Sequence, residues 1–270
     1  MNTQIMAIVN VSPDSFSGDG IASVDALKKR IAQVVSEGAD ILDIGGQSTR
    51  PGAEIITTDE EIRRVVPAIT AARQLTNLPI SVDTFKPAVA RAALEAGATI
   101  INDVHGFADR EMIQVAQSSQ ADLVVMHSRG TPQTMNQLTD YKSGLFTELS
   151  SFFAERTQQL IDAGIAPERI IIDPGIGFAK TMAQSFEATR HLAKLRTLGF
   201  RVLYGASMKS FLGKALGTET DPAPVEERAV ATTVTSTWAL LQQVAIIRVH
   251  DVKAAVQARR IVSHIVNETD

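Results

Sequence analysis

The sequence of 270 residues contains no cysteine, and this absence excludes several kinds of chemistry. A disulfide framework, thiolate catalysis and a zinc or iron–sulfur site with cysteine ligands all require that residue. The sequence also has no apolar run near the ~18 residues that span a bilayer. Its N-terminus lacks the basic region, apolar core and small-residue cleavage site of a secretion signal. We therefore expect a soluble, cytoplasmic protein.

Runs of positive charge are absent as well. The chain has 26 Lys and Arg against 30 Asp and Glu, which gives a formal net charge of −4. A nucleic acid or an anionic membrane is therefore not indicated as a partner. No low-complexity linker or break in composition divides the chain, and α/β barrels routinely fill this length as one unit. We expect a single domain over residues 1–270.

Short apolar runs alternate with segments of helical spacing along the whole chain. The expected strands are 5–11, 39–44, 80–84, 99–104, 122–127, 170–173, 202–207 and 245–251. The expected helices are 24–37, 59–75, 87–96, 110–117, 147–163, 183–198, 225–244 and 252–266. The helical segments repeat apolar residues at i, i+3 and i+4, the pattern of one buried face. Eight strand–helix units predict an α/β fold, a (β/α)8 TIM barrel. An open doubly wound sheet is the competing architecture, although it normally has fewer strands and a Gly-rich first turn, which is missing here.

Polar residues gather at the carboxyl ends of the expected strands. They are Asn10, Asp43, Asp83, Asn102, His127, Asp173, Ser207, Arg248 and His250. Barrels place their active sites on this face, where the ends of the parallel strands meet. Helix capping explains any one of these residues, but it does not explain side chains that converge from separate strands. We therefore expect the functional site at this end of the barrel.

Seven short segments make this pattern specific. They are Asn10-Val-Ser-Pro-Asp-Ser-Phe-Ser17, Asp43-Ile-Gly-Gly-Gln-Ser-Thr-Arg-Pro-Gly52, Ser81-Val-Asp-Thr84, Ile101-Asn-Asp-Val104, Asp173-Pro-Gly-Ile-Gly-Phe178, Ser207-Met-Lys-Ser210 and Arg248-Val-His-Asp251. In this order and spacing, residues 4 to 262 resemble the dihydropteroate synthases of folate biosynthesis. The resemblance implies a (β/α)8 fold. It also implies a transferase that condenses 4-aminobenzoate with (7,8-dihydropterin-6-yl)methyl diphosphate to give 7,8-dihydropteroate and diphosphate.

The resemblance assigns pterin binding to residues at four strand ends and to one apolar wall. These are Asp83, Asn102, Asp173, Lys209 and, as the wall, Met126. The edge of a pterin presents a row of donors and acceptors, which carboxylates and an amide at the floor of a dry pocket can pair. Helix capping or a structural hydrogen bond is the alternative role for Asp83, Asn102 or Asp173 taken alone. A solvated surface lysine is the alternative for Lys209, and barrel packing is the alternative for Met126. Asp173 is expected to be an ionised anchor for the pterin rather than a general acid.

Binding of the diphosphate is assigned to Asn10, Arg248 and His250. Arg248 can make a bidentate fork, and His250 follows two positions later, on the same side of a strand. Asn10 is expected to be the protein ligand of a Mg²⁺ that neutralises the leaving group, since magnesium takes few protein ligands. The expected catalytic residues are Lys209, Arg248 and His250. No side-chain nucleophile is expected.

The second substrate, 4-aminobenzoate, is expected nearer the rim. The residues assigned to it by resemblance are Thr49, Arg50, Pro51, Phe178 and Ser207. Proline and glycine alone would indicate only a turn at this point, but an adjacent Thr-Arg pair goes beyond turn chemistry. Members of the family are commonly dimeric. The resemblance therefore implies a homodimer whose other partners are small-molecule substrates.

The sequence departs from the family at several positions. Met208 stands where the family usually has arginine, and Ala179 stands where glycine is common. Gln47 stands where many members carry glutamate, and Gln184-Ser185 replaces a common His-Asn pair. The residues assigned to the pterin and the diphosphate are intact. The departures therefore bear mainly on the response to sulfonamides.

Two other functions share much of this pattern. A barrel that presents methyltetrahydrofolate to a corrinoid for methyl transfer has the same Asp–Asn–Asp floor but needs no diphosphate site. Asn10, Arg248 and His250 therefore favour the synthase. A pterin-binding paralogue without synthase activity is the other alternative, and Met208 is the residue that leaves it open.

Overall fold

The computed structural model describes residues 2–11, 21–48 and 53–266 of the chain. Within them, eight parallel strands pair in chain order and close into a barrel through the pairing of β1 with β8. The strands are β1 (Gln4–Asn10), β2 (Ile41–Gly45), β3 (Ile80–Asp83), β4 (Ile100–Asp103), β5 (Asp122–Met126), β6 (Ile170–Asp173), β7 (Arg201–Tyr204) and β8 (Ile246–Val249). The expected (β/α)8 barrel is confirmed, and the open doubly wound sheet is wrong.

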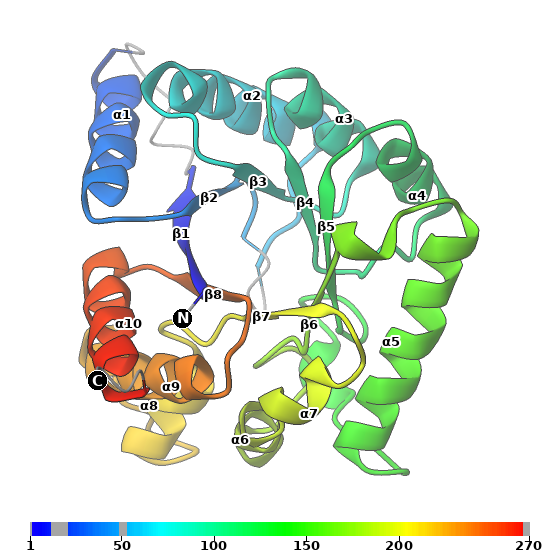
Figure 1. Cartoon of the computed structure of the whole chain (residues 1–270), viewed down its shortest axis with the longest axis vertical. Helices are drawn as coiled ribbons and strands as arrows, with labels where there is room; N and C mark the ends of the chain where they lie inside the picture. Colours follow the sequence, from blue (N-terminus) through cyan, green and yellow to red (C-terminus); the bar gives the residue numbers. More distant parts are fainter. Residues whose placement is uncertain (1, 12–20, 49–52, 267–270) are drawn as a thin grey trace.

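Helices surround the ring of strands on all sides (Figure 1). They are α1 (Ile21–Ser36), α2 (Thr58–Leu75), α3 (Pro87–Glu95), α4 (Arg110–Gln117), α5 (Leu145–Asp162), α6 (Met182–Arg190), α7 (Leu192–Arg196), α8 (Ser210–Leu216), α9 (Ala229–Leu241) and α10 (Val252–Val266). Local sequence explains several of their starts. Thr57 caps α2 by accepting from the backbone N–H of Glu60, and Thr181 and Gln184 form a reciprocal capping box at α6. Among the described residues, every helix is too short or too polar to cross a bilayer.

The strands divide their side chains between the barrel interior and the surrounding helices. Seven apolar side chains form a buried cluster inside the barrel: Met6, Ile41, Ile100, Val124, Ile171, Leu203 and Ile246. Two positions further along four of these strands stand polar residues: Asp43, Asn102, Asp173 and Arg248. Side chains two apart on a strand point to the same side. The polar residues therefore form the next layer of the interior, above an apolar plug that closes the barrel below them.

The opposite faces of the strands pack against the helices. This outer core contains fully buried side chains from both, such as Ile5 on β1, Leu42 on β2 and Phe153 on α5. Burial of such a side chain contributes roughly 1.5–3 kcal/mol relative to leaving it exposed. The strands are thus apolar on both sides along most of their length, which explains why they appear in the sequence as continuous apolar runs.

The structure differs from the expected elements in the last third of the chain. The helix expected at 183–198 is two helices, because His191 leaves helical geometry (φ −94°, ψ 14°) between α6 and α7. The strand expected at 202–207 ends at Tyr204, so Lys209 is not at its end but precedes the first residue of α8. No element was expected at α8, whose Phe211 and Leu212 are buried. The final strand ends at Val249, one residue before His250.

Candidate active site

A pocket of about 540 Å³ opens at the carboxyl ends of the strands. Seven of the residues expected at the site line it: Asn10, Asp83, Phe178, Ser207, Lys209, Arg248 and His250. Three others, Asn102, Asp173 and Met126, are buried and lie outside its lining. Thr49, Arg50 and Pro51 lie outside the described residues, as does the rest of the segment 49–52. The structure thus brings together the expected residues from β1, β3 and β8 and from the connections after β6 and β7.

Arg248 is held between two carboxylates. Its Nε donates to Oδ2 of Asp43 at 2.6 Å, and its Nη2 donates to Oδ2 of Asp83 at 2.7 Å. The side chain of Asp43 is fully buried. Burial opposes the charge of the guanidinium, but the carboxylates of Asp43 and Asp83 raise the pKa of Arg248 above its usual value. Two sides of the guanidinium are therefore fixed within the barrel, and Nη1 is left for a ligand.

Asp83 keeps one oxygen without a partner. Its Oδ1 is buried and accepts no hydrogen bond from the described residues, although the residue lines the pocket. Burial raises the pKa of Asp83 to about 7, with Arg248 lowering it and Asp43 raising it. A buried oxygen without a donor is costly. Asp83 can therefore accept a hydrogen bond from a ligand through Oδ1, either as the carboxylate or through the carbonyl oxygen of the protonated acid.

Asp43 was noticed in the sequence only as a polar residue at a strand end. In the structure it carries the shortest contact to Arg248 and lies 3.4 Å from Nδ2 of Asn102. Its position could have been inferred from parity, because it stands two residues after the inward-facing Ile41. Asp103 shows the converse. It follows Asn102 by one residue, and its two oxygens accept from the backbone N–H groups of His105 and Phe107 in a turn.

Asp173 and Lys209 lie on the other side of the floor. The Oδ1 atom of Asp173 accepts from the backbone N–H of Gly175 at 2.7 Å. Burial raises the pKa of Asp173, and Lys209 opposes that rise. Burial also lowers the pKa of Lys209 to about 8, and Asp173 opposes that fall. The Lys209 ammonium donates to the carbonyl of Ile176 at 2.5 Å and lies 4.7 Å from the ring centre of Phe178. A cation and an apolar ring thus share one wall of the pocket.

The turn after β6 approaches β5 so closely that only glycine fits. A Cβ at Gly175 would lie 1.9 Å from the carbonyl oxygen of His127, and the residue has φ +64°. Further along this turn, Ala179 has φ 48° in the left-handed region, at the position where glycine is common in the family. Holding alanine there costs roughly 1–2 kcal/mol. Its carbonyl accepts from the hydroxyl of Tyr141 at 2.9 Å, which helps to hold the turn.

A buried lysine that the sequence analysis passed over lies behind this turn. The Nζ atom of Lys180 is 3.0 Å from Nδ1 of His127 and donates to the carbonyl of Phe178 at 3.1 Å. Burial lowers the pKa of Lys180 to about 7, with Asp173 opposing. Burial, Lys180 and Arg129 lower the pKa of His127 to about 2. His127 is therefore a neutral acceptor that holds the lysine, and neither residue lines the pocket.

The remaining expected residues have structural partners of their own. Ser207 and His250 bond to each other, with the hydroxyl 2.9 Å from Nδ1 and accepting from the His250 backbone N–H at 3.1 Å. Met126 packs in a small buried cluster with Val104 and Phe178. Met208 has φ 60°, and its carbonyl accepts from Arg228, which also lines the pocket.

The side chains described in the pocket can supply one ligand to a metal ion but not a complete set of protein ligands. In the part of the chain that the structure describes, no group of three His, Asp or Glu side chains could hold a metal. Asn10 is exposed at the end of β1 and lines the pocket, so its side chain is available as a single amide ligand. A hard cation that completes its shell with water and phosphate oxygens fits such a site.

Comparison with known proteins agrees with this geometry. The model of the family described as "Pterin binding enzyme" matches residues 6–250. A dihydropteroate synthase of Synechocystis sp. is 45% identical over 257 residues, covering 94% of this chain and 87% of the relative. The barrel, the polar floor and this match define a pterin-binding enzyme.

Solved structures narrow the class. The Yersinia pestis dihydropteroate synthase in complex with a sulfonamide drug superposes with a TM-score of 0.90, at 35% identity, and covers 98% of this chain and 94% of its own. The Xanthomonas albilineans dihydropteroate synthase in complex with 7,8-dihydropteroate gives a TM-score of 0.85 at 36% identity, with coverages of 98% and 94%. The chain belongs to the dihydropteroate synthase family, which confirms the resemblance found in the sequence.

Proposed function

We propose that this enzyme condenses 4-aminobenzoate with (7,8-dihydropterin-6-yl)methyl diphosphate to form 7,8-dihydropteroate and diphosphate. One observation carries the proposal. A buried carboxylate oxygen without a donor, on Asp83, shares a pocket of about 540 Å³ with Asn10, Arg248 and His250, which suit an anionic leaving group. The complexes of the Xanthomonas albilineans synthase with 4-aminobenzoic acid and with 7,8-dihydropteroate support the same assignment.

The pterin ring is assigned to the floor of the barrel. Asp83 accepts an N–H of the ring through its free oxygen, and Lys209 faces the oxo side. Asp173 and Asn102 lie behind the lining, so ring entry requires a small rearrangement of the floor or contact through Asp83 and Lys209 alone. In either case Asp173 keeps Lys209 charged by opposing the effect of burial on the lysine pKa. Met126 and Phe178 supply an apolar boundary.

The diphosphate is assigned to the rim of the same pocket. The guanidinium of Arg248 and the imidazole of His250 are assigned to it, and the Ser207 hydroxyl orients the imidazole through its contact with Nδ1. Asn10 would hold Mg²⁺, which supplies neutralisation of the leaving group when it is bound. The second substrate is assigned to Phe178 and Ser207 together with Thr49, Arg50 and Pro51, whose roles stay predictions.

The reaction breaks the C–O bond between the methylene carbon and the diphosphate and forms a C–N bond to the amine, which then loses one proton. Arg248 and His250 stabilise the charge that develops on the leaving oxygen. Asp83 and Asp173 favour positive charge on the electron-rich ring. The barrel aligns the methylene with the amine, which converts an encounter between two substrates into a reaction within one complex. No side chain of the site is required as a nucleophile.

A direct assay separates this function from the alternatives. Purified protein is tested for binding of the pterin diphosphate by calorimetry and for formation of dihydropteroate, with and without Mg²⁺. The synthase requires product that depends on both substrates, with a rate that falls when Mg²⁺ is chelated. Binding without product would instead support the paralogue without synthase activity. Methyl transfer from methyltetrahydrofolate to a corrinoid would support the third function.

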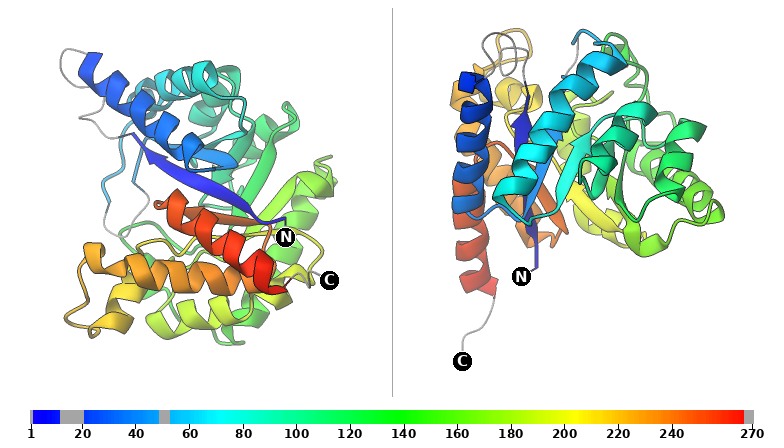
Figure 2. Two further views of the ribbon diagram at one scale, coloured as in Figure 1. Left: turned by 60° about the vertical axis from the view of Figure 1, so that its left-hand side comes forward. Right: turned by 90° about the horizontal axis from the view of Figure 1, so that it is seen from above.

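The proposal includes a homodimer formed through α9 and α10. These helices lie side by side on the outside of the barrel (Figure 2). Apolar side chains are exposed along one face of each: Val230, Val234, Trp238 and Leu241 on α9, and Ile261 and Ile265 on α10. A contiguous apolar patch of this kind marks an interaction surface, and the two-fold pairing of identical patches is the commonest way to cover one. A cytoplasmic location also stays a prediction.

Sedimentation measurements test the dimer. Val234→Glu places a charge at the centre of the proposed interface and is expected to shift the protein to monomer. Leu75→Glu, an exposed apolar position on α2, serves as the matched control and is expected to leave the mass unchanged. An unchanged mass for both variants would refute this interface.

A further inference from the structure

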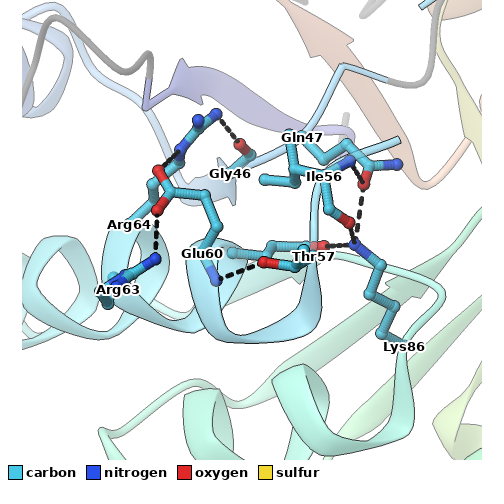
Figure 3. A network of polar contacts seen from close by, with 9 residues as sticks. Gly46, Gln47, Ile56, Thr57, Glu60, Arg63, Arg64 and Lys86 are labelled. Carbon is cyan, nitrogen blue, oxygen red and sulfur yellow. Dashed lines mark hydrogen bonds and ion pairs between the residues drawn. The ribbon is translucent and has the colours of Figure 1, made fainter. Parts of the chain in front are cut away.

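A buried lysine outside the pocket joins three segments of the chain. The Nζ atom of Lys86, just before α3, donates to Oε1 of Gln47 at 2.8 Å, to the carbonyl of Ile56 at 2.6 Å and to Oε2 of Glu61 at 2.7 Å (Figure 3). Gln47 and Ile56 lie in the connection between β2 and α2, and Glu61 lies on the first turn of α2. We call Lys86, Gln47, Ile56 and Glu61 the Lys86 cluster.

Charge and burial make the cluster rigid. The side chain of Glu61 is 1% exposed and that of Lys86 is 13% exposed. The ammonium group has three donors, and each meets one oxygen of the cluster. A buried ion pair is strongly destabilised when one partner is removed. Lys86 is therefore fixed by Glu61, and it in turn fixes the two groups of the β2–α2 connection.

The orientation of the Gln47 amide follows from its neighbours. Besides the Lys86 ammonium, its Oε1 receives the backbone N–H of Ile56 at 3.1 Å. Both neighbours are donors, so the oxygen must face them and the amide nitrogen must face away. Gln47 thus ties together residues nine apart in sequence, at the base of the connection. It also lines the pocket.

A second tie holds the residue before it. Arg64 on α2 donates from Nη1 to the carbonyl of Gly46 at 3.0 Å and from Nε to Glu60 at 2.8 Å. A Cβ added to Gly46 would lie 2.9 Å from a methyl carbon of Val65, so this part of the chain is packed against α2. Gly46, Gln47 and Ser48 form one wall of the pocket. Its position is set by Lys86 and by α2, whose Arg64 also lines the pocket.

This wall stands beside Asn10. Gly45 pairs with Asn10 across β1 and β2, and its carbonyl accepts from the backbone N–H of Val11 at 2.9 Å. A Cβ at Gly45 would lie 3.9 Å from the Asn10 amide oxygen. Gly45 also pairs with Asp83 on β3, and the same Cβ would lie 3.4 Å from the Cβ of Asp83. A shift of the wall therefore changes the space around both Asn10 and Asp83.

We infer that Gln47 and Lys86 are positioning residues for the part of the substrate site beside Asn10 and Asp83. They act through the wall formed by Gly46, Gln47 and Ser48 and do not touch the reacting atoms. The inference rests on the proposed function, because Asn10 is assigned to the diphosphate there. It predicts that loss of the Gln47 acceptor weakens binding of the pterin diphosphate.

The test uses two variants of one residue and two ligands. Gln47→Leu removes the acceptor for Lys86 and Ile56, whereas Gln47→Glu keeps an oxygen for both donors. The ligands are the pterin diphosphate and the matching 6-hydroxymethyl-7,8-dihydropterin without diphosphate, with dissociation constants measured by calorimetry. Gln47→Leu is expected to bind the pterin diphosphate about tenfold more weakly than wild type, and the alcohol is expected to bind more weakly as well, because Asp83 lies beside the wall. Gln47→Glu is expected to recover most of the lost affinity.

A second variant covers the case in which Gln47→Leu does not fold. Lys86→Met combined with Glu61→Gln removes the cluster without leaving a buried charge unpaired, and it is expected to show the same loss of affinity. A lower melting temperature with both dissociation constants unchanged would overturn the positioning role. Wild-type protein is assayed for product in parallel. No product from wild type refutes the proposed function, whereas product from wild type with an unaffected Gln47→Leu variant refutes only the positioning role.

Discussion

Asp43 offers the sharpest test of how the site is built. It contacts no ligand in the proposed arrangement. Its fully buried side chain accepts a hydrogen bond from Nε of Arg248 at 2.6 Å and so holds that edge of the guanidinium. Its substitution therefore changes the orientation of Arg248 without removing a substrate contact. Two variants separate geometry from charge. Asp43→Asn keeps a neutral acceptor for Arg248, and Asp43→Leu removes it.

The magnitude follows from the hydrogen bond. A hydrogen bond to a charged group contributes about 1.5–3 kcal/mol, and charge assistance accounts for roughly half of it. Each 1.36 kcal/mol is a factor of ten. Asp43→Asn is therefore expected to lower kcat/KM for the pterin diphosphate about 4- to 12-fold, and Asp43→Leu about 10- to 150-fold.

The pH dependence gives a second signature of the same change. Asp43 is one of the charges that raise the pKa of Asp83 to about 7. Without that charge the pKa of Asp83 falls, so the midpoint of pterin binding against pH moves to lower pH in both variants. The assay is initial-rate kinetics at saturating 4-aminobenzoate, with ring binding followed by fluorescence from pH 5 to 9.

Asp103→Asn is the matched control. Asp103 is equally buried, and burial raises its pKa to about 6, but its oxygens accept only from backbone N–H groups of a turn. It is expected to lower the melting temperature and leave kcat/KM unchanged. Values of kcat/KM within twofold of wild type for Asp43→Leu, with the same pH midpoint, would refute the role given to Asp43.

Three further outcomes are expected. Asp173→Asn should weaken binding of the pterin diphosphate far more than it raises KM for 4-aminobenzoate; unchanged pterin affinity in a titration would contradict its place at the floor. The raised pKa of Asp103 means that the folded state holds a proton between about pH 4 and pH 6 that the unfolded state has lost. Wild type should therefore lose stability relative to Asp103→Asn as the pH rises from about 4 to about 6, which urea unfolding at several pH values measures. The lowered pKa of Lys180 has the opposite sign: the unfolded state holds the proton from about pH 7 to about pH 10, so wild type should gain stability relative to Lys180→Met as the pH rises through that range, and parallel curves would exclude it.

The architecture was predictable because its determinants are local. Runs such as Ile170–Asp173 are apolar on both faces, which is diagnostic of strands covered by helices, and eight of them exhaust the chain. The break at His191 was not predictable in the same way, since the apolar spacing of α6 and α7 continues across it. The short helix α8 was also not predicted, because seven residues contain too few turns to show the helical spacing of apolar residues.

The site was predictable in its residue types but not in its contacts. Sequence placed Arg248 and His250 together on one side of a strand, yet Arg248 turns into the barrel to meet Asp43 and Asp83 while His250 bonds to Ser207. Those choices depend on distances across the barrel, which no local pattern records. The Lys86 cluster was missed for the same reason. Its members lie up to 39 residues apart, and none of them is the last residue of a strand.

The pairing of Arg248 with two distant carboxylates has a consequence for how the molecule assembles. Asp43 precedes Arg248 by 205 residues and Asp83 precedes it by 165. The strand β8 lies between β7 and β1, and its pairing brings the Arg248 guanidinium to these two acids. Closure of the ring and completion of the site are therefore one step. This step joins residues that are far apart in the sequence, and such contacts form slowly because closing a long loop costs entropy. Binding of a ligand at Arg248 therefore reports that the barrel has closed, because the arrangement of Arg248 with Asp43 and Asp83 exists only in the closed barrel.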